Sequence, residues 1–205
     1  MKLIERTMYL DKLKSVIGTP DIKVITGVRR CGKSKLLEAF KTYLEKEVEN
    51  ANIIHINYNL SDFEELKEYH ALNEYIKDRY ISGKENFILI DEIQMCPEFE
   101  LTINSVHASE QYDIYITGSN AFLLSSDLAT LFTGRYIEIP VLPFSFAEYR
   151  TYYGEKEIIG IKKSAEMINR TISASSLVEL PSMYHGDFSV NHAELYAETV
   201  KTICK

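Results

Sequence analysis

Short apolar runs alternate along the chain, up to about Val141, with longer segments in which apolar positions recur every three or four residues. This alternation is typical of βαβ units, in which parallel strands form a sheet and helices cover its faces. The apolar runs predict five strands, at residues 22–26, 52–60, 87–91, 112–117 and 135–141. We therefore expect an α/β fold, a parallel five-stranded sheet sandwiched by helices.

The periodic segments predict the helices between these strands. One helix is expected from Lys33 to about Val48, because its apolar residues repeat at three and four. Ser61 and Glu64 have the spacing of a capping box, which predicts a second helix running to about Ser82. The same spacing recurs at Ser145 and Glu148, after the last strand, and predicts a short helix through Tyr153.

The pattern weakens beyond residue 153. We expect residues 1–153 to form the core domain and residues 154–205 to be a short, mostly helical C-terminal tail, the start of a truncated second domain. The chain has no apolar run of the ~20 residues that a membrane helix needs. Its three cysteines, Cys31, Cys96 and Cys204, are too far apart for a metal or disulfide pattern. These features favour a cytoplasmic protein that does not contact a membrane.

Charge is distributed unevenly. Residues 1–46 contain 11 Lys/Arg and 5 Asp/Glu, whereas residues 47–110 contain 4 and 14. The net charge of the whole chain is −7, which argues against non-specific coating of DNA. A bound nucleotide explains the basic N-terminal stretch more economically, because that stretch surrounds a phosphate-binding motif.

That motif is GVRRCGKS, residues 27–34, which fits the pattern G-x-x-x-x-G-K-[ST] between a predicted strand and a predicted helix. Its glycines allow the backbone to curl so that N–H groups converge on phosphate oxygens, and the helix N-terminus adds further donors. The expected role of Lys33 is to bind the β- and γ-phosphates, and that of Ser34 is to ligate Mg²⁺. The two loop arginines either hold phosphates, pair with the acidic half of the domain or are solvated. The expected nucleotide-binding residues are Gly27, Val28, Arg29, Arg30, Cys31, Gly32, Lys33, Ser34 and Lys35.

The apolar strand at 87–91 ends in one acid, Asp91, and a second acid, Glu92, follows it directly. Asp91 is placed to hold Mg²⁺, and Glu92 beside it to align and polarise an attacking water. An adjacent glutamate is typical of hydrolytic ATPases, and most kinases and GTPases with this loop lack it. The alternative is a polar strand end that only faces solvent.

Together, GVRRCGKS, ILIDEIQ, ITGSNAFLLSS and LFTGRYIEIPVLPFSFAEY resemble a family of AAA-superfamily P-loop ATPases of bacteria and archaea. In that family the ATPase core precedes a C-terminal domain of unknown role. The resemblance runs from about Ile4 to Tyr153. It implies the ATPase core sheet, with the strand before the phosphate loop central and an extra strand inserted before the acid strand.

The resemblance also implies two further roles. Asn120 or Ser119 would be the polar sensor that detects the γ-phosphate, although both residue types also favour a helix N-cap. Arg135 would be an arginine finger that acts across a homo-oligomer, or else a structural ion-pair partner. A further hypothesis is that Asn57 or Asn59 holds Glu92 inactive until a partner binds.

The leading prediction is Mg²⁺-dependent hydrolysis of ATP to ADP and phosphate, with Glu92, Lys33, Arg135 and Asn120 as catalytic residues and Ser34 and Asp91 as metal ligands. The cofactors would be ATP and Mg²⁺, and the output would act on an unknown protein or nucleic-acid client. The alternative is a nucleotide-gated protein- or DNA-binding switch with negligible turnover. A small-molecule phosphotransferase is less favoured, because residues 118–154 lack an arginine-rich lid.

Overall fold

The computed structural model describes residues 6–118, 130–132, 134–145 and 148. The sequence expectations at Ser119 and Asn120 and beyond Glu148 lie outside these residues. Residues 3–143 belong to one compact unit, and Phe144 begins the continuous part of a second. In the second unit the capping box at Ser145 and Glu148 forms as predicted: the Ser145 N–H donates to Glu148 Oε2 (2.7 Å), and the Glu148 N–H donates to Ser145 Oγ (3.3 Å).

The first unit contains a five-stranded sheet in which every neighbouring pair is parallel. The spatial order is β2-β3-β4-β1-β5, so β4 separates β1 from β3. All five carboxyl ends lie at one edge of the sheet, because the strands are parallel. This arrangement confirms the expected fold class. The strands are β1 (Ile22–Thr26), β2 (Ala51–Asn57), β3 (Glu85–Asp91), β4 (Asp113–Thr117) and β5 (Tyr136–Pro140).

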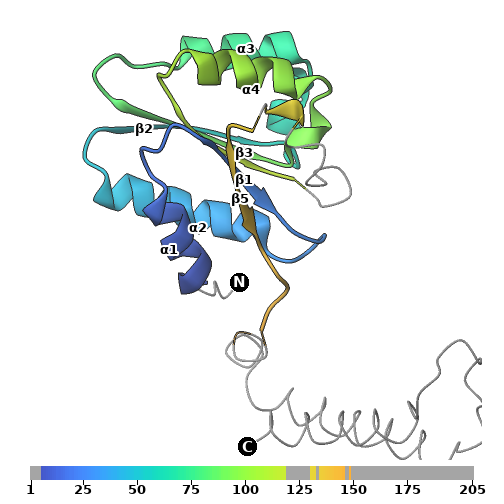
Figure 1. The fold of residues 1–205 in the computed structure, drawn as a ribbon. Coiled ribbons are helices and arrows are strands. Elements are labelled where there is room, and N and C mark those ends of the chain that lie inside the picture. Colours follow the sequence, from blue (N-terminus) through green and yellow to red (C-terminus); the bar gives the residue numbers. More distant parts are fainter. Residues whose placement is uncertain (1–5, 119–129, 133, 146–147, 149–205) are drawn as a thin grey trace, which may run out of the picture. The chain divides into compact units, whose positions relative to one another are not determined.

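In the described part of the chain, α-helices cover both faces of the sheet (Figure 1). On one face, α1 (Thr7–Ser15) and α2 (Lys33–Glu47) pack on a core that includes Leu37 and Phe40. On the other face, α3 (Tyr69–Asp78) and α4 (Phe99–Ala108) enclose a second core of mostly isoleucine side chains. β-Branched residues pack well on a pleated sheet, so both cores follow from the apolar runs.

The second predicted helix differs from what forms. Residues Ser61–Lys67 make a 3₁₀ segment, η1, whose N-cap is Leu60 with no side-chain capping bond within the described residues. Glu68 then adopts an extended conformation (φ −103°, ψ 134°), and α3 starts only at Tyr69. The prediction that Ser61 and Glu64 start an α-helix is therefore wrong. Helix α1 was not predicted, because its apolar positions are interrupted by charges.

β1, the strand before the phosphate loop, contains a buried charge that the apolar pattern does not predict. The Lys23 side chain is fully buried in β1, and its ammonium donates to Asp113 Oδ1 and to the Thr19 carbonyl, both at 2.5 Å. Asp113 also accepts the Gly18 N–H (2.9 Å), so a buried charge pair fixes β1 against β4 at the amino ends of the strands.

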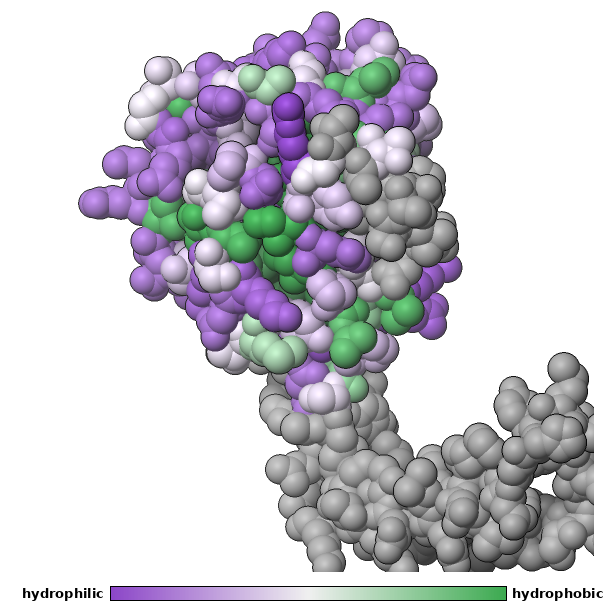
Figure 2. All heavy atoms as spheres, in the orientation of Figure 1, coloured by the Kyte–Doolittle hydropathy of each residue, from purple (hydrophilic) through white to green (hydrophobic). Residues whose placement is uncertain are grey.

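Figure 2 shows that the visible face of the first unit is mostly hydrophilic, with a hydrophobic area near its middle.

Candidate functional site

The phosphate loop begins at a position that only glycine fits. Gly27 follows β1 with φ +150°, and a Cβ placed there would lie 2.4 Å from the Val141 carbonyl oxygen and 2.7 Å from Cys31 Sγ. Val141 cannot move freely, because its backbone N–H donates to the Thr26 carbonyl (2.8 Å). Val141, the residue directly after β5, therefore packs against the first turn of the loop.

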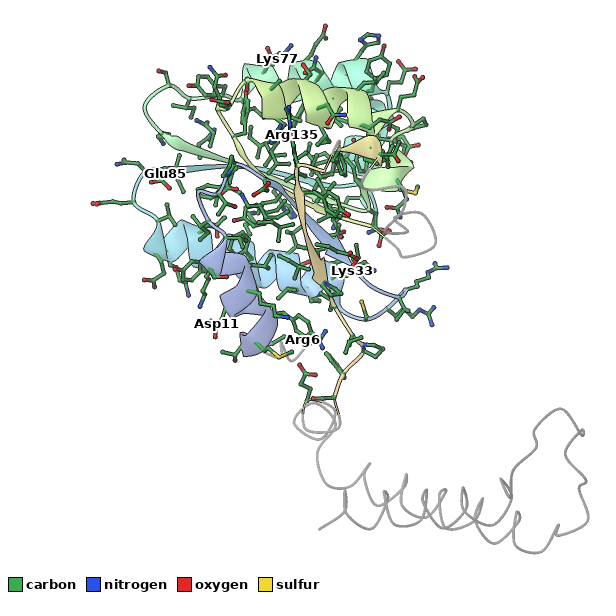
Figure 3. The ribbon with its side chains drawn as sticks, viewed as in Figure 1. Arg6, Asp11, Lys33, Lys77, Glu85 and Arg135 are labelled. Atoms are coloured by element: carbon green, nitrogen blue, oxygen red, sulfur yellow. The ribbon has the colours of Figure 1, made fainter. Side chains whose placement is uncertain are left out.

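Lys33 is the first residue of α2 and is only 4% exposed. Its ammonium donates to the carbonyl oxygens of Gly27 (2.9 Å) and Val28 (3.2 Å), so the charge lies against the curve of the loop (Figure 3). Gly32 precedes it as the N-cap in the left-handed region (φ 99°), and no side chain in the described part of the chain caps this helix end. A buried ammonium beside an uncapped helix N-terminus is a suitable environment for phosphate oxygens.

The other loop residues divide into exposed and packed positions. Val28, Arg29 and Arg30 are exposed, and Arg30 has a left-handed backbone (φ 67°). The Cys31 side chain is buried in the core beneath the loop, where it contributes packing and leaves only its backbone to a ligand. Lys35 is exposed on α2 and pairs with Glu38 (2.6 Å).

Ser34, the predicted metal ligand of the loop, is the second residue of α2 and is half-buried.

Arg6 also belongs to the loop, although the sequence analysis did not select it. Arg6 is buried, and its guanidinium donates to the Cys31 carbonyl (2.9 Å) and to the Pro143 carbonyl (3.4 Å). It also stacks on the Tyr9 ring, 4.4 Å from the ring centroid. Arg6 therefore ties the phosphate loop to the chain beyond β5. Nothing in the local sequence around Arg6 indicated this contact, which spans 25 positions.

The acid pair lies at the same edge of the sheet. Asp91 ends β3 and is 1% exposed, and Glu92 follows it in a left-handed conformation (φ 58°, ψ 51°). Thr117, which ends β4, connects the two: its hydroxyl donates to Asp91 Oδ1 (2.6 Å) and accepts the Glu92 N–H (3.0 Å). Thr117 pairs in register with Ile25, two residues before Gly27. Two strand spacings, about 10 Å, therefore separate the β3 end from the β1 end.

One carboxylate oxygen of Asp91 is available to a ligand. Its Oδ2 is buried and has no hydrogen-bond partner among the described residues. A buried carboxylate oxygen without a donor costs free energy unless a cation or a hydrogen bond compensates it. Carboxylate oxygens are the ligands that Mg²⁺ prefers in proteins, so the residues at this edge fit the metal that the sequence predicted.

The Glu92 side chain has a partner that was not predicted. Gln94 Nε2 donates to Glu92 Oε2 in a very short contact. The hypothesis that Asn57 or Asn59 holds Glu92 is not supported by their contacts, because the Asn57 side-chain oxygen accepts both the N–H (3.0 Å) and the side-chain amide (3.2 Å) of Asn59.

Arg135 lies away from this group. It precedes β5, its carbonyl accepts the Ile22 N–H at the start of β1, and its side chain is exposed. Figure 3 shows Arg135 and Lys33 at opposite ends of the sheet. Arg135 therefore does not reach the phosphate loop of its own chain. Ser119 and Asn120, the predicted sensors, lie outside the described residues, but the strand that leads to them ends at Thr117, within the site.

Comparison with known proteins identifies the family. A family described as "AAA domain" matches residues 19–150, well over half of the chain. The chain belongs to the AAA domain family. The resemblance to AAA-type P-loop ATPases is thereby confirmed for the matched residues, and this AAA domain has the parallel P-loop sheet architecture.

Two relatives of this AAA domain are named as uncharacterised proteins. An uncharacterised protein of Haemophilus influenzae is 40% identical over 149 residues, which are 72% of this chain and 37% of that protein. The uncharacterised protein MJ1544 of Methanocaldococcus jannaschii is 31% identical over 128 residues, which are 62% of this chain and 28% of that protein. The chain thus matches little more than a third of the first relative's length and less of the second's.

Solved structures are similar to this AAA domain only at a distance. Domain III of the Thermotoga maritima replication initiation protein DnaA has a TM-score of 0.47 at 17% identity, covering 100% of this chain and 84% of that one. Saccharomyces cerevisiae RIF2 has a TM-score of 0.49 at 13% identity, covering 98% and 70%. Within the described residues, no helix has the length and apolar character needed to cross a bilayer.

The bridging role of Thr117 leads to a stability prediction. Thr117→Val keeps the shape of the side chain but leaves Asp91 Oδ1 without its donor and the Glu92 N–H without its acceptor. We expect the free energy of unfolding to fall by about 2 kcal/mol, because unpaired buried polar groups cost about 1–3 kcal/mol. Thr42→Val is the control: Thr42 is exposed and bonds only its own helix, so a change of about 0.5 kcal/mol or less is expected. Denaturant unfolding measures both, and equal effects would contradict the bridge.

Proposed function

We propose that this AAA domain binds ATP with Mg²⁺ and hydrolyses it to ADP and phosphate. The observation that supports this most is the location of two groups at one edge of the sheet. The buried Lys33 ammonium lies against the glycine loop, and the buried Asp91, with an unpaired oxygen, is followed directly by Glu92. A simple structural ion-pair network would instead leave Lys33 and Asp91 paired with opposite charges.

Each residue has a distinct role in this reaction. Lys33 and the backbone N–H groups of residues 28–34 bind the phosphate oxygens and offset the charge that develops on them. Ser34 and Asp91 would hold Mg²⁺, which supplies positive charge to the β- and γ-phosphates. Glu92 accepts a proton from the attacking water while the oxygen of that water bonds to the γ-phosphorus. The bond from that phosphorus to the β–γ bridging oxygen breaks, and ADP leaves with the electron pair.

The output of hydrolysis is proposed to be a conformational or regulatory change that acts on a protein or nucleic-acid client. We propose that the ATPase core extends to residue 153, beyond the compact unit that ends at Pro143, and that residues 154–205 form a separate C-terminal part. Because Arg135 is exposed at the far end of the sheet, a role as an arginine finger requires a second copy of the chain. Ser119 and Asn120 remain the proposed sensors.

Two neighbouring lysines provide the test. ATP binding and steady-state hydrolysis are measured with Mg²⁺ and with a chelator, for the wild type, Lys33→Ala and Lys35→Ala. Lys33→Ala is expected to weaken ATP binding about 100-fold, since it removes hydrogen bonds from a charged donor to phosphate. Lys35→Ala is the matched control, because its ammonium is exposed and paired with Glu38.

Each failure has a different meaning. Binding without Mg²⁺-dependent turnover in the wild type would replace the hydrolase with a nucleotide-gated switch. Absence of ATP binding by the wild type would overturn the proposed function altogether. Equal affinities of Lys33→Ala and Lys35→Ala would show that the loop lysine does not contact phosphate.

A further inference from the structure

The chain segment after Asp91 makes a tight turn that is anchored in the core. Glu92 is the N-cap of η2 (Ile93–Met95), a single 3₁₀ turn closed by the Met95 N–H donating to the Glu92 carbonyl (3.0 Å). Ile93 is fully buried in the core beneath α3 and α4. The turn is therefore held at its centre by packing and at its start by the bond from the Glu92 N–H to Thr117.

The backbone of Glu92 determines where its side chain points. Side chains two positions apart do not face each other within a helical turn. Glu92, however, lies just outside the turn with φ 58° and ψ 51°, a conformation that costs a non-glycine residue about 1–2 kcal/mol. This conformation allows the Glu92 carboxylate to meet the Gln94 amide. Left-handed backbone of this kind persists where the surroundings enforce it, as the Thr117 bond and the Ile93 anchor do here.

The Gln94 amide is held at one end only. Its nitrogen donates to Glu92 Oε2, whereas its carbonyl oxygen is buried and has no partner among the described residues. Rotating the Gln94 amide by 180° would exchange its nitrogen and its oxygen. The Gln94 carbonyl oxygen would then face Glu92 Oε2, and two hydrogen-bond acceptors would repel each other. The bond to the carboxylate is charge-assisted and thus among the stronger hydrogen bonds of a protein. It compensates for the unpaired carbonyl and fixes the direction of the amide.

We propose that Gln94 is a positioning residue for the hydrolytic step, which rests on the function proposed above. By binding Glu92 Oε2, the Gln94 amide immobilises the carboxylate and leaves Oε1 to accept the proton of the attacking water. A general base must lie within hydrogen-bond reach of that proton, so loss of the amide lowers the turnover rate without weakening ATP binding. Gln94 itself does not touch the reacting atoms.

The composition of the chain allows a direct test of the contact in solution. The sequence contains two glutamines, Gln94 and Gln111, and Gln111 is exposed. Selective ¹⁵N labelling of glutamine side chains thus gives two amide groups in an NMR spectrum, assigned by Gln94→Met and Gln111→Ala. The Gln94 amide protons are expected downfield of those of Gln111 and to exchange more slowly with solvent. Glu92→Ala should move the Gln94 signals toward the Gln111 position and leave Gln111 unchanged.

The kinetic test uses Gln94→Met, which keeps the length of the side chain but removes the donor, with Gln111→Ala as its control. We expect kcat to fall by up to about 100-fold in Gln94→Met, as misplacement of a catalytic group does, with the ATP dissociation constant and Tm close to those of the wild type. Gln111→Ala should match the wild type in all three. A fall in Tm that accompanies the fall in kcat would indicate a merely structural role and overturn the proposal.

The two tests separate this inference from the proposed function. If the wild type hydrolyses ATP and Gln94→Met has the same kcat, positioning by Gln94 is wrong and the hydrolase remains. If the wild type does not hydrolyse ATP, the proposed function fails and positioning for hydrolysis fails with it. In that case the NMR experiment still decides whether the contact exists. Gln94 signals that coincide with those of Gln111 and ignore Glu92→Ala would overturn the contact itself, whatever the turnover.

Discussion

Replacing Glu92 with glutamine is expected to reduce ATP turnover by about 100- to 10,000-fold while ATP binding stays close to that of the wild type. The substitution keeps the size of the side chain and removes its ability to take a proton, and general bases contribute rate factors of this order. Binding is spared because Lys33 and the loop backbone make the phosphate contacts. Steady-state phosphate release and ATP binding by titration measure the two properties separately.

Glu98 offers a closely matched control for Glu92. It is also a glutamate with a left-handed backbone (φ 56°), but it is exposed at the start of α4 and six residues further along the chain. Glu98→Gln should therefore turn over ATP like the wild type. Turnover by Glu92→Gln within tenfold of that of Glu98→Gln would rule out Glu92 as the base and favour the nucleotide-gated switch.

Gly27→Ala is expected to abolish ATP binding and to lower the thermal stability of the domain. The added methyl group would lie 2.4 Å from the Val141 carbonyl oxygen, so the end of β5 or the loop must shift. Overpacking of this kind costs about 1–3 kcal/mol. The positive φ of Gly27 (+150°), which alanine rarely adopts, adds about 1–3 kcal/mol. Because the loop N–H groups must converge on the phosphates, displacement of their first residue removes the binding site.

Gly83→Ala isolates the effect of crowding from that of backbone strain. Gly83 has φ +81°, yet a Cβ placed there meets no heavy atom within 4 Å. This variant should lose only the strain contribution and should bind ATP normally. Thermal unfolding and ATP titration of both variants provide the comparison. Normal ATP binding by Gly27→Ala would mean that the contact between loop and β5 relaxes without consequence.

The features that the sequence predicted well depend on local pattern. The α/β sheet follows from apolar runs such as residues 87–91, and each strand was placed within three residues of its observed ends. Lys33 and Asp91 were recognisable because the loop motif and the strand-end acid are defined by neighbours in the chain. Gly27 was selected for its conformational freedom, although the close approach of Val141 that makes it necessary involves a strand more than a hundred residues away.

The features that were missed depend on tertiary contacts. Thr117 bonds Asp91 and Glu92 only because β4 lies between β3 and β1, an order that apolar runs do not encode. The Gln94 contact requires the left-handed backbone of Glu92, which propensity would not assign to a glutamate. The position of Arg135 was partly predictable: the start of a parallel strand lies at the opposite end of the sheet from a loop that follows another strand.

The hydrogen bonds from Arg6 to Cys31 and Pro143 have a practical consequence for choosing domain boundaries. The family match begins at residue 19, but the packed unit already includes Arg6 and α1. Tyr9 and Leu13 fill the core beside Phe40, and the Tyr9 hydroxyl accepts the Leu142 N–H (3.1 Å) just after β5. A recombinant fragment that begins at the family boundary would lack Arg6 and α1. It would expose part of that core and leave the Cys31 and Pro143 carbonyls without the hydrogen bonds from Arg6. Fragments intended for nucleotide assays should therefore start upstream of Arg6.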